Sequence, residues 1–237
     1  FNVAAHTDGP LPPDALAAPD GLVLPHPSEG RWEHTIGTGT PVFTPDEIAA
    51  IADFVHRGGG LIVLGETEED KYGANLNELL TPFGISIENA TVQDYTHHHK
   101  GSPAWVLANL EQGAHPATGP HLLARVDAAC FYRAGTLALH NGATSIATTH
   151  DTADPPSAPL AATTTHGAGR VCVLADSDLF GDDCIDALGH RNLWLNLVFW
   201  AAGHAFAAPA QPPLSPAAED PHWHALKDAV AELRLTQ

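Results

Sequence analysis

The segment Thr44–Glu66 constrains the fold more than any other part of the sequence, because a helix, a glycine run and a buried strand follow one another there without a gap. Thr44-Pro45-Asp46-Glu47 is a capping box that predicts the start of a helix. Three glycines at 58–60 end this helix, and the next four residues, 61–64, are all aliphatic. A strand that is apolar on both faces is typical of a parallel sheet covered by helices.

We therefore expect an α/β fold with a mainly parallel sheet and helices on both faces. A β-hairpin region is expected late in the chain, around Asn141-Gly142 and around the turn at 167–169. Residues 192–202 predict a helix that is apolar on nearly every side and is buried between layers. Apolar or alternating runs predict further strands at 22–24, 85–87, 131–139, 144–150, 160–165 and 170–175.

The chain is expected to divide into a domain, a linker and a terminal helix. Residues 1–206 are expected to form the α/β domain, and 207–217, with four prolines, a semi-rigid linker. Residues 218–237 predict an amphipathic helix with one narrow apolar stripe. Such a stripe must be buried on this chain, on a second copy or on a partner, since a short isolated helix is marginal in water.

The charge of the chain excludes several classes of partner. Ten basic residues against 28 acidic ones give a formal net charge of -18. Such a chain repels phosphate backbones and anionic membrane surfaces, so we expect neither nucleic acid nor a membrane as a partner. The net charge does not exclude a small molecule, a metal, a protein partner or a second copy of the chain as the binding partner. The three cysteines form no CxxC pair, and no signal peptide is visible, so a cytoplasmic location is expected.

Three consecutive histidines, His97 to His99, are the sharpest chemical signal. In an extended segment His97 and His99 point to the same side. Two imidazoles at that spacing can share a divalent metal such as zinc, with Asp94 or a distant carboxylate completing the set. The alternative is a solvated loop that happens to be rich in histidine.

A second group of polar residues follows the ends of the predicted parallel strands. Because the carboxyl ends of parallel strands meet at the same edge of a sheet, we expect His26, Glu66 and Asp176 to lie together, with His34 and Asp178 nearby. Glu66 and Asp176 are the candidate catalytic carboxylates of this site, and the other three are candidate ligand-binding residues. The alternatives are that loops at this edge are simply polar and that Asp176 caps the following turn.

The motifs around these strands resemble a known family. Phe54–Glu66 resembles the helix–glycine–strand core of class I glutamine-amidotransferase-like domains. Asn75–Ile85, 169–180 and 192–196 are similar to a domain shared by gliding-motility transporter proteins and intraflagellar-transport proteins. The resemblance implies a flavodoxin-like sheet used for ligand binding or assembly. True amidotransferases carry a cysteine nucleophile where this chain has Glu66, so the resemblance does not imply glutaminase activity.

Two classes of function follow from these observations. In the first, the domain is a ligand-binding or assembly module without glutaminase activity. In the second, it is a metal-dependent enzyme, with hydrolysis as the expected reaction, in which His97 and His99 hold the metal and Glu66 activates a water. No nucleotide cofactor is indicated, because the glycines at 58–60 precede their strand, whereas phosphate-binding glycines follow one.

Overall fold

A computed structural model describes residues 1–7, 9–26, 42–67, 75–111 and 122–206. The chain divides into two compact units, Phe1–Ala205 and Phe206–Gln237. All but the first residue of the second unit lies outside the described residues. The expected linker at 207–217 and helix at 218–237 fall there, so the proposed domain boundaries stay predictions.

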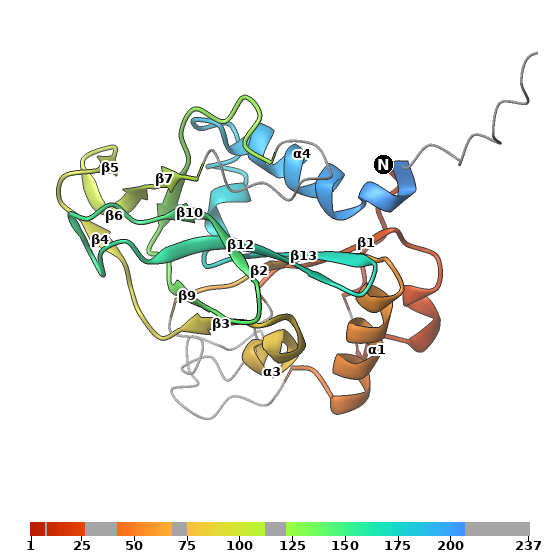
Figure 1. Ribbon diagram of the computed structural model, residues 1–237. Coiled ribbons are helices and arrows are strands. Elements are labelled where there is room, and N and C mark those ends of the chain that lie inside the picture. Colours follow the sequence, from red (N-terminus) through yellow and green to blue (C-terminus); the bar gives the residue numbers. More distant parts are fainter. Residues whose placement is uncertain (8, 27–41, 68–74, 112–121, 207–237) are drawn as a thin grey trace, which may run out of the picture. The chain divides into compact units, whose positions relative to one another are not determined.

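A mixed six-stranded sheet forms the framework of the first unit, in the order β1-β2-β13-β12-β10-β7 (Figure 1). Its strands are β1 (Gly21–Leu24), β2 (Gly60–Leu64), β7 (Asn109–Leu110), β10 (Thr144–Thr148), β12 (Pro159–His166) and β13 (Gly169–Leu174). β1 pairs with β2, and β2 with β13, in parallel. β12, β10 and β7 extend the sheet from β13 by antiparallel pairing.

The fold is thus mixed α/β, and a mainly parallel, flavodoxin-like sheet is not what the structure shows. β1 and β2 are parallel because helix α1 (Pro45–His56) lies between them in the chain, as a parallel crossover requires. β12 and β13 are separated only by Gly167 and Ala168, and so short a connection joins antiparallel neighbours. The expected hairpin around 167–169 therefore forms the centre of the main sheet, as β12 and β13, rather than an addition to it.

Three small antiparallel sheets complete the strands of the described chain. They pair β3 (Ile85–Glu88) with β9 (Thr136–Leu139), β4 (Gln93–Asp94) with β11 (Ala153–Asp154), and β6 (Ser102–Leu107) with both β5 (His98–His99) and β8 (Cys130–Tyr132).

Two sequence-based expectations are wrong in this region. The predicted strand 131–139 is divided into β8 and β9, because Arg133 turns the chain at a φ of 48°. The predicted hairpin around Asn141-Gly142 does not form, although both residues have the positive φ of a tight turn. The strands on either side of that turn enter different sheets, since β9 pairs with β3 and β10 pairs with β7 and β12. The sequence predicted the tight turn itself, but longer-range packing decides which strands pair.

Helices cover both faces of the parallel strands (Figure 1). Alternate residues of β2 and β13 enter two separate hydrophobic clusters, as the period-2 geometry of a strand requires. One cluster contains Ile62, Leu64, Cys172 and Leu174 with residues of α4 (His190–Ala201); the other contains Leu61, Val63, Val171 and Val173 with residues of α1 and α3 (Leu76–Leu80). Short 3-10 helices are η1 (Pro13–Leu16), η3 (Thr81–Phe83), η4 (Asp178–Phe180) and η5 (Gly203–Phe206).

The predicted Thr44–Glu66 unit is present as expected. Thr44 accepts a hydrogen bond from the Glu47 amide, and the Glu47 carboxylate accepts one from the Thr44 amide at 2.8 Å, so the capping box is complete. Gly60 begins β2 without a side chain because a Cβ there would lie 2.4 Å from the Ala201 carbonyl carbon of α4. The glycine therefore permits the close packing of α4 on β2.

Helix α4 is less buried than its sequence suggests. Its inner face packs in the core through Leu193, Leu197 and Trp200. Leu195 and Phe199 are each 41% exposed, so α4 covers the sheet from outside instead of lying between two layers. No helix of the described residues is both long and apolar enough to cross a membrane.

Candidate functional site

The carboxyl ends of the three parallel strands bring four candidate residues to one edge of the sheet. His26 follows β1, Glu66 follows β2, and Asp176 and Asp178 follow β13. The registers of β2 against β1 and β13 are continuous, so these ends lie level with one another. Backbone bonds fix the ends further, because the Gly65 amide donates to the Leu174 carbonyl at 2.7 Å. The sheet geometry thus places the side chains as the strand pattern predicts.

Glu66, Asp176 and Asp178 form the group that we call the acidic edge. One carboxylate oxygen from each residue lies within 4.8 Å of the others, and the described residues contain no other such group of three or more His, Cys, Asp or Glu. Asp176 is fully buried, Glu66 is half-buried and Asp178 is exposed. The edge is therefore anchored in the interior and opens to solvent on the side of Asp178.

Hydrogen bonds fix two of these carboxylates. Asp176 accepts from the Tyr132 amide at 2.6 Å and from the Asp178 amide at 2.8 Å. Glu66 accepts from the Ser177 hydroxyl and, at 3.3 Å, from the Ser177 amide. Asp176 thus caps the turn that follows β13, as one sequence-based alternative predicted, and the same contact places it beside Glu66.

Burial and repulsion from neighbouring carboxylates oppose ionisation of the three carboxyl groups of the acidic edge. Burial raises the pKa of Glu66, and the Asp178 carboxylate raises it further. The pKa of Asp176 is raised well above its usual range by burial and by the charge of Glu66, against the hydrogen bond from Tyr132. Desolvation and the nearby Asp183 carboxylate also raise the pKa of Asp178. All three shifts indicate that ionisation is disfavoured at this edge.

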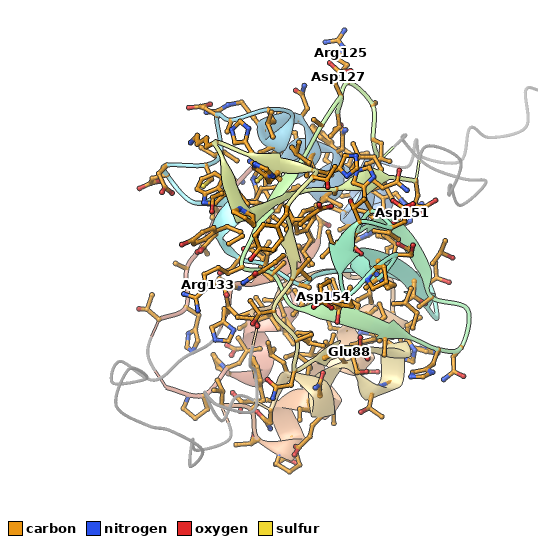
Figure 2. All side chains as sticks on the ribbon, turned by 90° about the vertical axis from the view of Figure 1, so that its left-hand side faces the viewer. Glu88, Arg125, Asp127, Arg133, Asp151 and Asp154 are labelled. Atoms are coloured by element: carbon orange, nitrogen blue, oxygen red, sulfur yellow. The ribbon has the colours of Figure 1, made fainter. Side chains whose placement is uncertain are left out.

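Two basic side chains act weakly on the acidic edge. The charge of His26 lowers the pKa of Glu66, and that of Arg133, labelled in Figure 2, lowers the pKa of Asp178. Neither contribution overcomes burial, because the net pKa shift of each carboxyl is upward. His34, the remaining candidate for this edge, lies outside the described residues.

The histidine run has a different surrounding, which we call the histidine cluster: Asp94, His97, His150 and Thr152. Asp94 accepts hydrogen bonds from the amides of Thr96 and His97, at 2.7 and 2.9 Å, and from the Thr152 hydroxyl at 2.9 Å. The Thr152 oxygen lies 2.8 Å from Nδ1 of His97. Since the hydroxyl proton goes to Asp94, Nδ1 of His97 must donate to Thr152.

His97 and His99 do not share a face. The ring of His97 stacks on His150, with centroids 3.9 Å apart, whereas His99 lies against Trp105, with ring centroids 6.0 Å apart. The ligand atoms of Asp94, His97 and His99 do not form a group within 4.8 Å. The assumed extended geometry is wrong because the Asp94 side chain turns the backbone at His97, and β5 begins only at His98. A metal role for these residues stays a prediction without a preassembled three-ligand site.

Sequence reasoning missed Ser177 and His190. Ser177 lies between Asp176 and Asp178, the two predicted site residues, and its hydroxyl donates a hydrogen bond to the Glu66 carboxylate. His190 is 1% exposed and bonded at both ring nitrogens, to Cys130 and Cys184. Its position at the start of an apolar helix was the only available signal, and a lone histidine there does not indicate such contacts.

The comparisons with known proteins identify the family and the fold. Residues 34–198 match the family model described as "Domain of unknown function (DUF4350)". The mmIFT52 N-terminal domain is similar in structure, with a TM-score of 0.63 and 20% identity over 81% of this chain and 80% of that one. A search of curated proteins finds no match.

Two bacterial structures are also similar. Cytoplasmic Protein STM1381 from Salmonella typhimurium LT2 has a TM-score of 0.55 and 18% identity over 81% of this chain and 76% of its own. Cytoplasmic Protein STM3548 from Salmonella typhimurium has a TM-score of 0.54 and 17% identity over 82% and 76%. At these identities the structures show a shared fold alone. The family match covers more than half of the sequence, and the chain therefore belongs to the DUF4350 family.

Proposed function

We propose that this chain is a binding module without glutaminase activity, and that the acidic edge of Glu66, Asp176 and Asp178 holds its ligand, a divalent cation. The observation that carries the proposal is the convergence of three carboxylates within 4.8 Å at the carboxyl end of parallel strands. Carboxylate oxygens are the ligands that hard divalent cations prefer in proteins. The open side at Asp178 gives the cation a path of entry and a place for waters or a bridging partner group.

Electrostatics supports a cation more than a neutral ligand. The pKa of each carboxyl is raised, so burial and repulsion from neighbouring carboxylates oppose its ionisation. A bound cation would remove that repulsion and lower the three pKa values together. Binding would therefore release protons and would stabilise the folded chain by mass action.

The cysteines support the absence of glutaminase activity. All three, Cys130, Cys172 and Cys184, are buried. Burial raises the pKa of Cys130 to about 12 and raises the pKa values of the other two as well. A cysteine nucleophile needs an accessible thiolate, which these environments disfavour. The proposal includes the resemblance to amidotransferase-like domains, which rests on the strand that ends at Glu66. This resemblance concerns the fold and not the activity.

Calorimetric titration of the full chain with Ca²⁺, Mg²⁺ and Zn²⁺ at pH 7 tests the proposal. We expect one site for at least one of these ions, and affinity reduced roughly tenfold or more in Glu66→Gln and Asp178→Asn, since each loses a charged ligand. Asp151→Asn is the matched control, because Asp151 is exposed and outside the acidic edge (Figure 2). Equal affinity in all four proteins, or no binding, would refute the proposed cation site.

A further inference from the structure

The ring of His190 is held in one protonation state by its two hydrogen bonds. Nε2 lies 2.9 Å from the amide nitrogen of Cys130, and Nδ1 lies 2.8 Å from the carbonyl oxygen of Cys184. An amide can only donate and a carbonyl can only accept, so Nε2 must be unprotonated and Nδ1 must carry the proton. A second proton on the ring would set the N–H of Nε2 against the N–H of Cys130.

The position of His190 in the fold also opposes a positive charge. The residue is 1% exposed and is the first residue of α4, where the helix dipole is positive. Burial lowers the pKa of His190 and the charge of His99 lowers it further, against backbone hydrogen bonds at Cys184, Cys130 and Leu179, which raise it. The histidine is therefore neutral at neutral pH and resists protonation below the usual histidine range.

His190 connects the two segments that support the acidic edge. Cys130 begins β8, and the amide of Tyr132 in the same strand donates to Asp176. Cys184 belongs to residues 181–189, which follow Asp178 through η4 and lead into α4. The backbone bonds within this segment are mostly local turns, with Gly189 donating to Ala128 at its end. The imidazole thus ties 181–189 to β8.

We propose that His190 is an acid-operated latch: its protonation breaks the bond from the Cys130 amide, releases residues 181–189 from β8 and so weakens ligand binding at the acidic edge. The release itself follows from the His190 contacts, whereas its effect on binding rests on the proposed function. Among described residues, His99 of β5 is the titratable group whose charge acts on the ring, which is bonded to Cys130 and Cys184. The Asp183 carboxyl acts on the thiol of Cys184. Lys100 and Asp176 are the charges that act on both thiols.

The sign of the pH effect follows from linkage. The opened state takes up a proton near the ordinary histidine pKa of about 6.5, and the closed state does so only at lower pH. The opening equilibrium should therefore rise by about tenfold per pH unit as the pH falls below that value, until the closed state also protonates. The carboxylates of the acidic edge act in the opposite direction, because their pKa values are raised in the folded state.

Amide hydrogen exchange of the full chain, followed by NMR between pH 7 and 5 and corrected for intrinsic rates, tests the latch. The amides of Cys130 and Gly189 report it directly, since both are donors across the contact. We expect their opening to increase together by about tenfold per pH unit below about 6.5 in the wild type. His190→Gln should remove that pH dependence, and His140→Gln, at an exposed histidine, should keep it.

A second measurement on the wild type serves if His190→Gln does not fold. The ring nitrogen shifts of His190 should report the Nδ1–H tautomer at pH 7 and should keep it at the pH where the exchange begins to rise, since the closed state takes up a proton only at lower pH. Exchange that is independent of pH, or ring nitrogens of the opposite tautomer, would overturn the latch even if cations bind. Absence of cation binding at pH 7 would instead overturn the proposed function, and pH-dependent exchange would then support the release alone.

Discussion

Two fully buried aspartates of this protein have opposite electrostatic surroundings. Asp94 and Asp176 are both 0% exposed, and each follows or ends a strand. Burial raises the pKa of Asp94, but two backbone amides, the Thr152 hydroxyl and His97 together hold it below the usual value. Asp176 has two amide donors but stands beside Glu66, and its pKa is raised well above the usual value.

The difference separates Asp94, a structural carboxylate, from Asp176, for which we propose a role in cation binding. Asp94 accepts three hydrogen bonds that hold two loops together, so the charge of its carboxylate is compensated within the histidine cluster. At the acidic edge, burial and repulsion from neighbouring carboxylates outweigh the hydrogen-bond donors, so the pKa values are raised. Burial alone therefore does not indicate function; the balance of donors against neighbouring charges does.

The largest effect expected from this comparison is on stability. Asp94→Ala would leave three partly buried donors without their acceptor, at a cost of about 3 kcal/mol in the free energy of unfolding. Asp176→Ala also removes an acceptor, but it relieves repulsion with Glu66 and should cost less. Urea unfolding at pH 7 measures both, with Asp151→Asn as the control. An equal or larger loss of unfolding free energy in Asp176→Ala would contradict our assignment of Asp94 as the structural carboxylate of the two.

The next effect concerns pH. A carboxyl group with a raised folded pKa contributes stability that is present at low pH and is lost as the pH rises through that pKa. The wild type should therefore gain stability relative to Glu66→Gln as the pH falls from 7 toward 4, by roughly 1 kcal/mol. Asp94 should behave oppositely, its contribution being lost in acid as the pH falls through its lowered pKa. Parallel pH profiles for Glu66→Gln and Asp94→Asn would contradict the comparison.

The smallest expected effect is that of the histidines on metal affinity. We expect the double variant His97→Ala, His99→Ala to bind Ca²⁺ or Mg²⁺ with affinity within about twofold of the wild type, because neither ring belongs to the acidic edge. Zinc measured in the same variant tests the sequence-based hypothesis of a histidine site. If this variant loses all metal while Glu66→Gln retains it, the histidine cluster is the metal site and the acidic edge is not.

The sequence predicted those parts of the molecule that depend on local patterns and on strand direction. The capping box at Thr44, the buried strand after it and the meeting of Glu66 with Asp176 could all be inferred, since carboxyl ends of parallel strands share an edge. The antiparallel hairpin of β12 and β13 could also be inferred from its short turn. The pairings of β9 with β3 and of β10 with β7 and β12 could not, because these partners are chosen by packing across the core.

The histidine run shows why a side-chain period is insufficient for a site. Alternation placed His97 beside His99, but the bonds from the Thr96 and His97 amides to Asp94 turn the chain before β5 begins. The strand pair β5–β6 also has a register shift between His98 and His99. A side chain that binds its neighbours' backbone competes with extended structure, and a residue pattern does not reveal which of the two prevails.

The central claim is that the acidic edge binds a divalent cation, and anomalous diffraction from crystals of the full chain soaked in Mn²⁺ tests it most directly. Mn²⁺ shares the preference of Mg²⁺ and Ca²⁺ for carboxylate oxygens. We predict one strong anomalous peak coordinated by oxygens of Glu66, Asp176 and Asp178, and no such peak in Glu66→Gln. A peak at Asp94 and His97, or no peak at the acidic edge at saturating Mn²⁺, would contradict the account.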